Sequence, residues 1–192
     1  MPTPNTAALA FLQSRRSRPA KTLTTPVPGD DDLRTLLTIA VRTPDHGKLE
    51  PWRFIVLQRP ALLRLAAEVE KFVSARTDDT AIIAKQTAQY ANAHLAVAVV
   101  ESPKPSPKIP PLEQTYSVGA VCLALLNGAL ASGWGANWLS GPASHDAEFT
   151  QTNLGLAPYE RIAGLIHLGT ETNPPPERPR PDVDSITTWV AS

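Results

Sequence analysis

Two short basic segments of the 192-residue chain carry residue types suited to binding an anion. The first is Arg15-Arg16-Ser17, in which two guanidinium groups stand beside a hydroxyl. Guanidinium groups bind phosphate oxygens through paired hydrogen bonds, and a serine hydroxyl can add another. The segment is therefore a candidate phosphate clamp. The alternative is a basic helix end that interacts favourably with the helix dipole.

The second basic segment contains Arg42, His46 and Lys48. A helix is expected to end before Pro44, because the residue that precedes a proline is disfavoured in the helical conformation, and a strand is expected after Pro51. A short connection between a helix and a strand can present these cationic donors to an anionic ligand and hold them in place. The alternative is a set of solvated charges with a histidine that satisfies a turn.

The elements that must position these segments are predicted from the spacing of apolar residues. A short helix over residues 7–12 leads into the first basic segment, and a helix that begins at Asp30–Asp32 leads to Arg42. Two strands and two further helices follow from the same kind of pattern. They are a strand over Trp52–Leu57, a helix from Pro60 to Val73, a helix around Ala81–Ala91 and a strand over Leu95–Val100.

The most apolar helix is expected from Leu112 to about Ser132. It has almost no charge, so it must be covered on most of its sides, and association with a second subunit is one way to cover it. Its Gly119 and Gly128 suggest the close approach of another backbone or of a flat ligand. The proline-rich connection before it, Ser102–Pro111, is expected to be a surface spacer.

The C-terminal third begins with a glycine- and tryptophan-rich crossing, Gly133–Pro142, which predicts a turn and a short strand. A short helix is expected within Asp146–Leu156, followed by a strand over Ile162–Leu168 that Gly169-Thr170 end. The proline-rich arm at about residues 171–192 is expected to be extended and to dock on its own body or on a partner chain.

Composition excludes several classes of protein and of site. Lysine plus arginine and aspartate plus glutamate both number 18, so no overall charge attracts nucleic acid or membrane phosphates. The single cysteine, Cys122, excludes an intrachain disulfide framework and a clustered-thiolate metal site, which favours a reducing cytoplasm. No signal peptide is visible, and the apolar stretch Val118–Ala131 is too short to cross a bilayer.

Sequence motifs of the common nucleotide and metal sites are missing. The chain contains no G-x-G-x-x-G, Walker loop or H-E-x-x-H. His94, His145 and His167 are far apart and are not spaced with carboxylates as metal ligands, so we interpret them as structural. The length fits one domain over residues 1–192.

Four fragments in this order resemble the FMN-dependent nitroreductase family, and in particular its short, single-domain branch of NAD(P)H nitroreductases. The similarity extends from about Leu9 to Thr170. The fragments are Arg15-Arg16-Ser17, then Arg42-x-Pro44-Asp45-His46 with Pro51-Trp52-x-Phe54, then Gly133-Trp134-Gly135-Ala136-x-Trp138, and finally Leu168-Gly169-Thr170.

The resemblance implies an α+β fold in which a central, mostly antiparallel sheet is flanked by helices, in an intertwined homodimer with FMN at the subunit interface. By that similarity Arg15, Arg16 and Ser17 hold the phosphate and ribityl end, and Arg42 and His46 come from the other subunit. The site is completed by Trp138, Leu139 and Ser140. The segment Gly128, Ala129, Leu130, Ala131, Ser132 and Gly133 resembles one that contacts the nicotinamide nucleotide.

The resemblance also implies an oxidoreductase that passes electrons from NAD(P)H through FMN to a nitroaromatic, a quinone or a related small acceptor. Such a scheme requires no catalytic residue, no metal, no nucleic acid and no membrane. We hypothesise that Arg42 helps to stabilise negative charge on the reduced flavin. The alternatives are a noncatalytic FMN-binding protein and a simple structural dimer.

Two positions depart from the pattern of the family. Leu139 stands where close relatives carry a basic residue, which removes a side-chain contact to phosphate, and Arg178 or Arg180 could replace that contact. Glu50 stands where relatives often carry a neutral glutamine, so it either alters the polarity near the ring or faces solvent.

Overall fold

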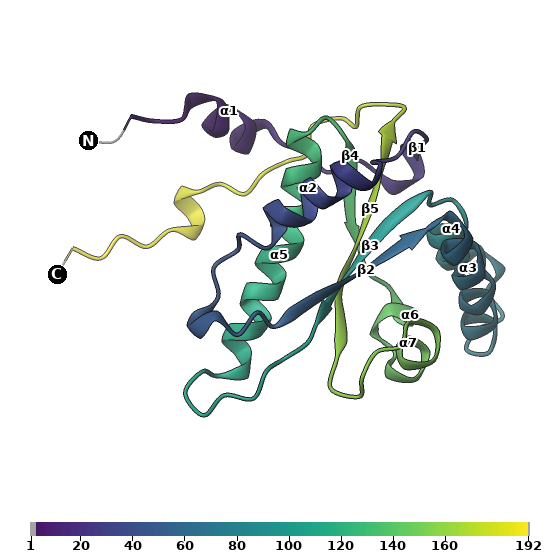
Figure 1. Ribbon diagram of the computed structural model, residues 1–192. Helices are drawn as coiled ribbons and strands as arrows, with labels where there is room; N and C mark the ends of the chain where they lie inside the picture. The colour runs from purple at the N-terminus through teal and green to yellow at the C-terminus, as the bar shows by residue number, and fades with distance from the viewer. Residues whose placement is uncertain (1–2, 192) are drawn as a thin grey trace.

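A five-stranded antiparallel sheet forms the centre of the protein (Figure 1). The computed structural model describes residues 3–191. The central strand is β5, which pairs with β3, β4 and β1, and β2 pairs with β3 at one edge. The predicted α+β fold is confirmed. The strands are β1 (Leu23–Thr24), β2 (Trp52–Gln58), β3 (Leu95–Glu101), β4 (Gly135–Leu139) and β5 (Arg161–Glu171).

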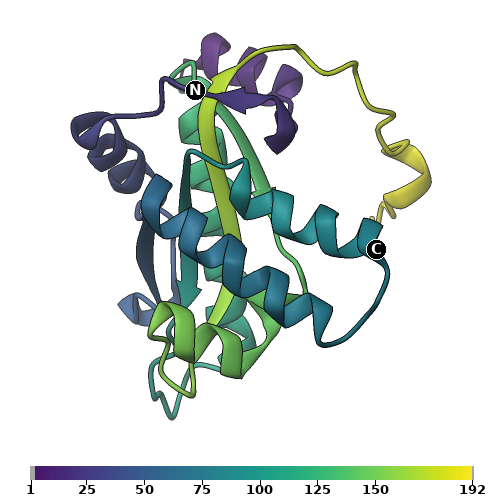
Figure 2. The ribbon, with the colours of Figure 1, turned by 90° about the vertical axis from the view of Figure 1, so that its right-hand side faces the viewer.

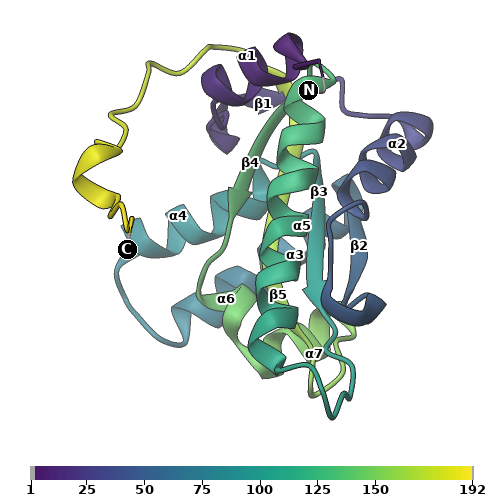
Figure 3. The ribbon, with the colours of Figure 1, turned by 90° about the vertical axis from the view of Figure 1, so that its left-hand side faces the viewer.

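Helices cover both faces of the sheet, as Figures 2 and 3 show from opposite sides. One hydrophobic cluster joins α2 (Asp30–Ala40) and α5 (Pro111–Ala131) to the sheet. The other cluster joins the opposite face to the remaining helices of the body. Those helices are α3 (Arg59–Ser74), α4 (Thr80–Ala91), α6 (Pro142–His145) and α7 (Ala147–Leu154).

The strand β3 explains why the sequence over Leu95–Val100 has no polar face. Alternate residues of a strand point to opposite faces of the sheet, and here both faces are covered. Val97 and Val99 belong to the cluster with α5, whereas Ala96 and Ala98 belong to the cluster with α3. All four side chains are almost fully buried.

The predicted end of the last strand was wrong. Gly169 and Thr170 continue β5 to Glu171, because β1 pairs with Thr170 and Glu171 and supplies their hydrogen-bonding partner. The two-residue strand β1 and the short helix η1 (Ala20–Thr22) were not predicted, since elements of two or three residues show no apolar period. The four-residue helix α6 was missed for the same reason.

The helix α5 is longer than the apolar stretch that the sequence analysis considered. By length and composition alone it is the one helix, within residues 3–191, that could cross a membrane. Val118, Val121 and Leu125 are fully buried against the sheet, which is the arrangement of a core helix in a folded domain. Its other side exposes Leu112, Tyr116 and Leu123, with 44–64% of each side chain accessible.

The C-terminal arm after β5 extends away from the sheet and contains only the short helix η3 (Asp184–Ile186), as Figure 2 shows. Val183, Ile186, Trp189 and Val190 of this arm are 67–83% exposed. Apolar side chains of this size are rarely left so exposed together in a monomer, so the arm is suited to contact another surface.

Candidate functional site

The first basic segment follows α1 (Thr6–Ser14) and has spare hydrogen-bonding capacity. Arg15 Nη2 donates to Ser17 Oγ at 3.1 Å, and Arg16 Nη1 donates to the carbonyl oxygen of Ser17 at 3.2 Å. The Nε atoms of Arg15 and Arg16 are buried, and neither has a partner among the described residues. Buried guanidinium donors without acceptors favour the binding of an anion.

The charges around Arg15 also favour an anion. Burial lowers the pKa of Arg15, and the positive charges of Arg180 and Arg16 lower it further. Three guanidinium groups therefore lie close enough to repel one another, and a bound phosphate would relieve that repulsion. A cavity of 230 Å³ adjoins Arg15 and Arg16 and reaches Gly133 at the end of α5.

Hydrogen bonds fix the first basic segment alongside β4. The Arg18 backbone N–H donates to Ala136 O at 2.8 Å, and Asn137 Nδ2 donates to Arg18 O at 2.7 Å. The side chain of Arg18 forms an ion pair with Glu171 on β5 at 3.3 Å. Arg18 therefore ties the chain directly after Arg15-Arg16-Ser17 to the strand that ends at Leu139.

A cavity of 560 Å³ is lined by Pro19–Lys21, which follow the first basic segment, by α4 and by residues of the β4–β5 pair. Leu139 and Ser140 line it, so two of the three residues predicted after the glycine- and tryptophan-rich turn face this space. Trp138 does not line it and is 38% exposed. The other polar lining residues are Lys21, Lys85, Gln86, Gln89, Asn92, Asn137 and His167, none of which the sequence analysis selected.

His167 is the most deeply buried polar residue of this cavity, with 2% of its surface exposed. It pairs with Asn137 across the β4–β5 ladder, which places both side chains on the same face of the sheet. Its Nε2 atom has no partner in the part of the chain that the structure describes. Burial lowers the pKa of His167 to about 4, so the imidazole is neutral at physiological pH.

His167 is expected to make the folded protein less stable in mild acid. The free energy of unfolding should fall as the pH decreases from 6.5 towards 4, by up to about 1.4 kcal/mol per pH unit. In this range the unfolded histidine, with its ordinary pKa of 6.5, binds a proton that the folded histidine does not. Urea denaturation at pH 7, 6 and 5 measures the effect.

The His167→Gln variant is the control for this pH dependence, because glutamine does not titrate. Glu160 changes the stability in a lower pH range than His167, because its hydrogen bonds with Arg53 lower its pKa from 4.5 to about 2. If the free energy of unfolding of His167→Gln fell between pH 6.5 and 5 as much as that of the unsubstituted protein, His167 would not be the cause of the pH dependence.

The second basic segment forms a tightly constrained loop. The carboxylate of Asp45 accepts hydrogen bonds from the backbone N–H groups of Leu49 and Glu50, both at 2.9 Å. Positive φ angles occur at Gly47 (76°), Lys48 (54°) and Glu50 (49°). A side chain at Gly47 would also collide with Ile109. A backbone held in such an unusual conformation is typical of functional loops.

Within this loop His46 is held at one ring nitrogen. Its Nδ1 atom lies 2.6 Å from Glu113 Oε2 at the start of α5, and 62% of the His46 side chain is exposed. Arg42 is also exposed, two residues beyond the end of α2. Glu50 is exposed as well, and it lines a cavity of 660 Å³ next to Lys48.

Within one chain the structure does not bring the two basic segments together. Figure 3 shows α1 and β4 on one side of α5, and α2 with the following loop on the other side. The cavity that contains Lys48 shares no lining residue with the cavities beside Arg15 and Ser140. If Arg42 and His46 act at the same ligand as Arg15, they must therefore come from a second subunit.

The predicted segment Gly128–Gly133 lies at the end of α5. A Cβ atom on Gly128 would lie 3.1 Å from Ile39 Cγ2, so α2 is the neighbour that requires this glycine. Ala129 is fully buried and has no side-chain surface for a nucleotide, whereas Leu130 and Gly133 line the cavity beside Arg15. Around Gly119 a side chain would meet no atom within 4 Å.

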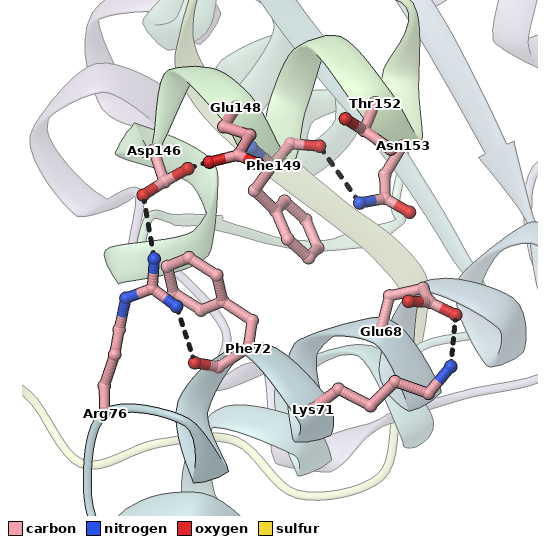
Figure 4. A pocket seen from close by; sticks show the side chains of 9 residues that line it. All are labelled: Glu68, Lys71, Phe72, Arg76, Asp146, Glu148, Phe149, Thr152 and Asn153. Atoms are coloured by element: carbon pink, nitrogen blue, oxygen red, sulfur yellow. Dashed lines mark hydrogen bonds and ion pairs between the residues drawn. The ribbon is translucent and has the colours of Figure 1, made fainter.

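A groove of 310 Å³ between α3 and α7 is less suited to a charged ligand, because four of its five charged lining residues already form ion pairs with one another (Figure 4). Arg76 stacks over the ring of Phe72, 3.5 Å from its centre, and forms an ion pair with Asp146 at 3.3 Å. Lys71 pairs with Glu68 at 2.9 Å. Of these contacts, the Arg76–Asp146 ion pair joins the end of α3 to the start of α7.

Comparisons with known proteins show what this chain is similar to. The model of the "Nitroreductase family" matches residues 12–170. The Escherichia coli K12 protein named "Putative NAD(P)H nitroreductase YdjA" is 33% identical over 164 residues, which are 85% of this chain and 87% of that protein. A Haemophilus influenzae protein named "Putative NAD(P)H nitroreductase" is 30% identical over 164 residues, 85% of this chain and 88% of that protein.

Solved structures share the fold. The nitroreductase-like family protein of Bacillus cereus has a TM-score of 0.80 at 21% identity, covering 99% of both chains. A nitroreductase from Desulfovibrio desulfuricans, solved in complex with FMN, has a TM-score of 0.74 at 20% identity, covering 99% of this chain and 100% of that chain.

Proposed function

This chain belongs to the nitroreductase family of oxidoreductases, and from that premise we propose that it is an FMN-dependent NAD(P)H oxidoreductase. It would pass electrons from NAD(P)H through FMN to a nitroaromatic, a quinone or a related small acceptor, in the cytoplasm. The observation that carries the proposal is the pair of buried, unpartnered Nε atoms of Arg15 and Arg16. These two arginines line the 230 Å³ cavity, and the chain after them continues into Pro19–Lys21, which line the 560 Å³ cavity.

The residues present fit the two ends of FMN. The phosphate carries close to two negative charges, and Arg15, Arg16 and Ser17 offer donors for its oxygens. The ring is flat and mainly apolar, with one polar edge, and the cavity beside Leu139 and Ser140 combines apolar with polar lining. We propose that the phosphate binds at the first basic segment and the ring in the cavity.

Bound FMN would supply the hydride and electron chemistry, and the protein positions the reactants and excludes water. Lys21 and Lys85 line the cavity, and their ammonium groups would stabilise negative charge that develops on the ring during reduction. The hypothesis based on the sequence gave part of this role to Arg42 and did not consider Lys21 or Lys85. No nucleophile or acid–base pair of the protein is needed for this scheme.

The C-terminal arm supports the proposal that one of its arginines replaces the basic side chain that close relatives carry at the position of Leu139. Arg180 acts on the pKa of Arg15, so its positive charge lies near the proposed phosphate site. Glu177 accepts a hydrogen bond from Arg180 Nε at 3.0 Å and orients it. We therefore propose Arg180, and not Arg178, as the additional contact to phosphate.

We also propose that the functional unit is a homodimer. The exposed apolar side chains of α5, including Leu112 and Tyr116, offer one surface for a second copy, and the arm with Trp189 offers another. A dimer would cover both surfaces and would bring Arg42 and His46 of one subunit to the FMN of the other. A nicotinamide contact at Gly128–Gly133 would lie beside the same site.

The visible absorption spectrum of the purified protein tests the proposed activity. The protein should be yellow, or should bind added FMN with one equivalent per chain, and NADH or NADPH should bleach the flavin absorbance in the absence of oxygen. Bound flavin that neither nucleotide reduces would indicate a noncatalytic FMN-binding protein. A protein that binds no FMN would contradict the proposal and would leave a structural dimer.

A further inference from the structure

Two residues that line the 560 Å³ cavity each have a polar side-chain atom that no described residue satisfies. His167 Nε2 and Gln89 Nε2 are both buried, and neither has a hydrogen-bonding partner within residues 3–191. His167 comes from β5 and Gln89 from α4, so two different elements bring these side chains to the same cavity. A buried polar atom without a partner destabilises a protein by about 1–3 kcal/mol, unless a ligand or a water molecule satisfies it.

Gly141, directly after Ser140, lies close to the side chains of Gln86 and Gln89 on α4. A Cβ atom on Gly141 would lie 3.0 Å from Gln86 Oε1 and 3.6 Å from Gln89 Oε1. The chain directly after Ser140 therefore passes against the side chains of α4. The amide group of Gln89 and the imidazole of His167 are uncharged donors or acceptors, in contrast to the guanidinium groups that bind phosphate.

We propose that His167 and Gln89 bind the polar pyrimidine edge of the FMN ring and so select its orientation in the cavity. This inference rests on the proposed function. The pyrimidine edge carries carbonyl oxygens and an N–H group, whereas the opposite edge of the ring carries methyl groups. Because buried polar atoms require polar partners, the edge with hydrogen-bonding groups belongs at His167 and Gln89, and the methyl edge belongs away from them.

A neutral histidine suits this role better than a charged one. Burial keeps the imidazole uncharged at physiological pH, so it forms a hydrogen bond with the ring in either redox state. The lysines at the rim, Lys21 and Lys85, remain available for the charge of the reduced ring. Orientation and charge stabilisation would thus be assigned to different residues of the same cavity.

The experiment compares two flavins, FMN and N3-methyl-FMN, in which a methyl group blocks the pyrimidine edge. Dissociation constants are measured from flavin fluorescence with protein freed of flavin. The unsubstituted protein should bind N3-methyl-FMN at least about tenfold more weakly than FMN. His167→Leu and, separately, Gln89→Leu should each weaken FMN binding about tenfold, as expected for the loss of one buried hydrogen bond. Both variants should discriminate less between the two flavins.

Two controls separate binding from folding. His167→Gln retains a hydrogen-bonding group and should recover most of the affinity and discrimination, whereas His145→Leu on the exposed surface of α6 should change neither. If His167→Leu fails to fold, Gln89→Leu gives the same comparison from a different element. Equal discrimination in both folded leucine variants and the unsubstituted protein would overturn this inference without affecting the proposed function. A lack of FMN binding by the unsubstituted protein would overturn the proposed function.

Discussion

Replacing Arg15 and Arg16 together by alanine is expected to weaken FMN binding by about two to three orders of magnitude. Each arginine offers charge-assisted hydrogen bonds to phosphate, and each such bond contributes about 1.5–3 kcal/mol. The buried Nε atoms of both residues have no protein acceptor among the described residues, so the ligand gains their donors without breaking existing bonds. Fluorescence titration of the flavin-free protein with FMN gives the two dissociation constants.

Riboflavin provides the matched probe for this prediction, because it has the same ring without the phosphate. The double variant and the unsubstituted protein should bind riboflavin with similar affinity, within about threefold. Arg34→Ala, at an exposed position on α2, is the control for a general loss of positive charge and should bind FMN normally. An equal loss of affinity for both flavins in the double variant would show that Arg15 and Arg16 act on folding and not on the phosphate.

We also expect two variants that each bind FMN poorly to restore one FMN site when one chain of each forms a mixed dimer. Arg15→Ala with Arg16→Ala removes the first basic segment, and Arg42→Ala with His46→Ala removes the second. Each variant alone should bind FMN poorly at both sites of its homodimer. The two segments lie on different sides of α5 in one chain, so a mixed dimer has one site with both segments intact and one site with neither.

Co-expression of the two variants with different affinity tags isolates the mixed dimer. We expect one FMN per two chains, bound with an affinity close to that of the unsubstituted protein, and half of its specific activity. If Arg42 and His46 served the site of their own chain, the mixed dimer would contain two defective sites and would bind no better than either parent. A monomer at all concentrations would contradict both outcomes and with them the proposed dimer.

The sequence determined those elements whose own residues carry the pattern. The unbroken apolar run Leu95–Val100 is a strand covered on both faces, and the periodic apolar residues after Asp30 form α2. Such elements are predictable because burial of each residue depends on a local period of the chain. The order of short fragments also indicated the family, and residues 12–170 match it.

Tertiary structure alone decided which side chains share the cavity. His167 lies in a strand whose sequence predicts only that it is buried, and its unpartnered Nε2 becomes significant because α4 and the segment after Arg16 enclose a space in front of it. Gln89 is one polar residue among several on α4, and only the folded chain shows that its Nε2 atom is buried without a partner among the described residues.

Packing between distant segments also decided the position of the C-terminal arm and the end of β5. The sequence predicted an extended arm, but only the folded chain places Arg180 near Arg15, more than 160 residues away along the chain. The sequence predicts that Gly169 and Thr170 end the strand, but the two residues of β1, from a distant segment, pair with Thr170 and Glu171 and continue it. A local sequence pattern predicts whether a residue is buried. Which residues it contacts depends on how distant segments pack, and no single stretch of the chain contains that information.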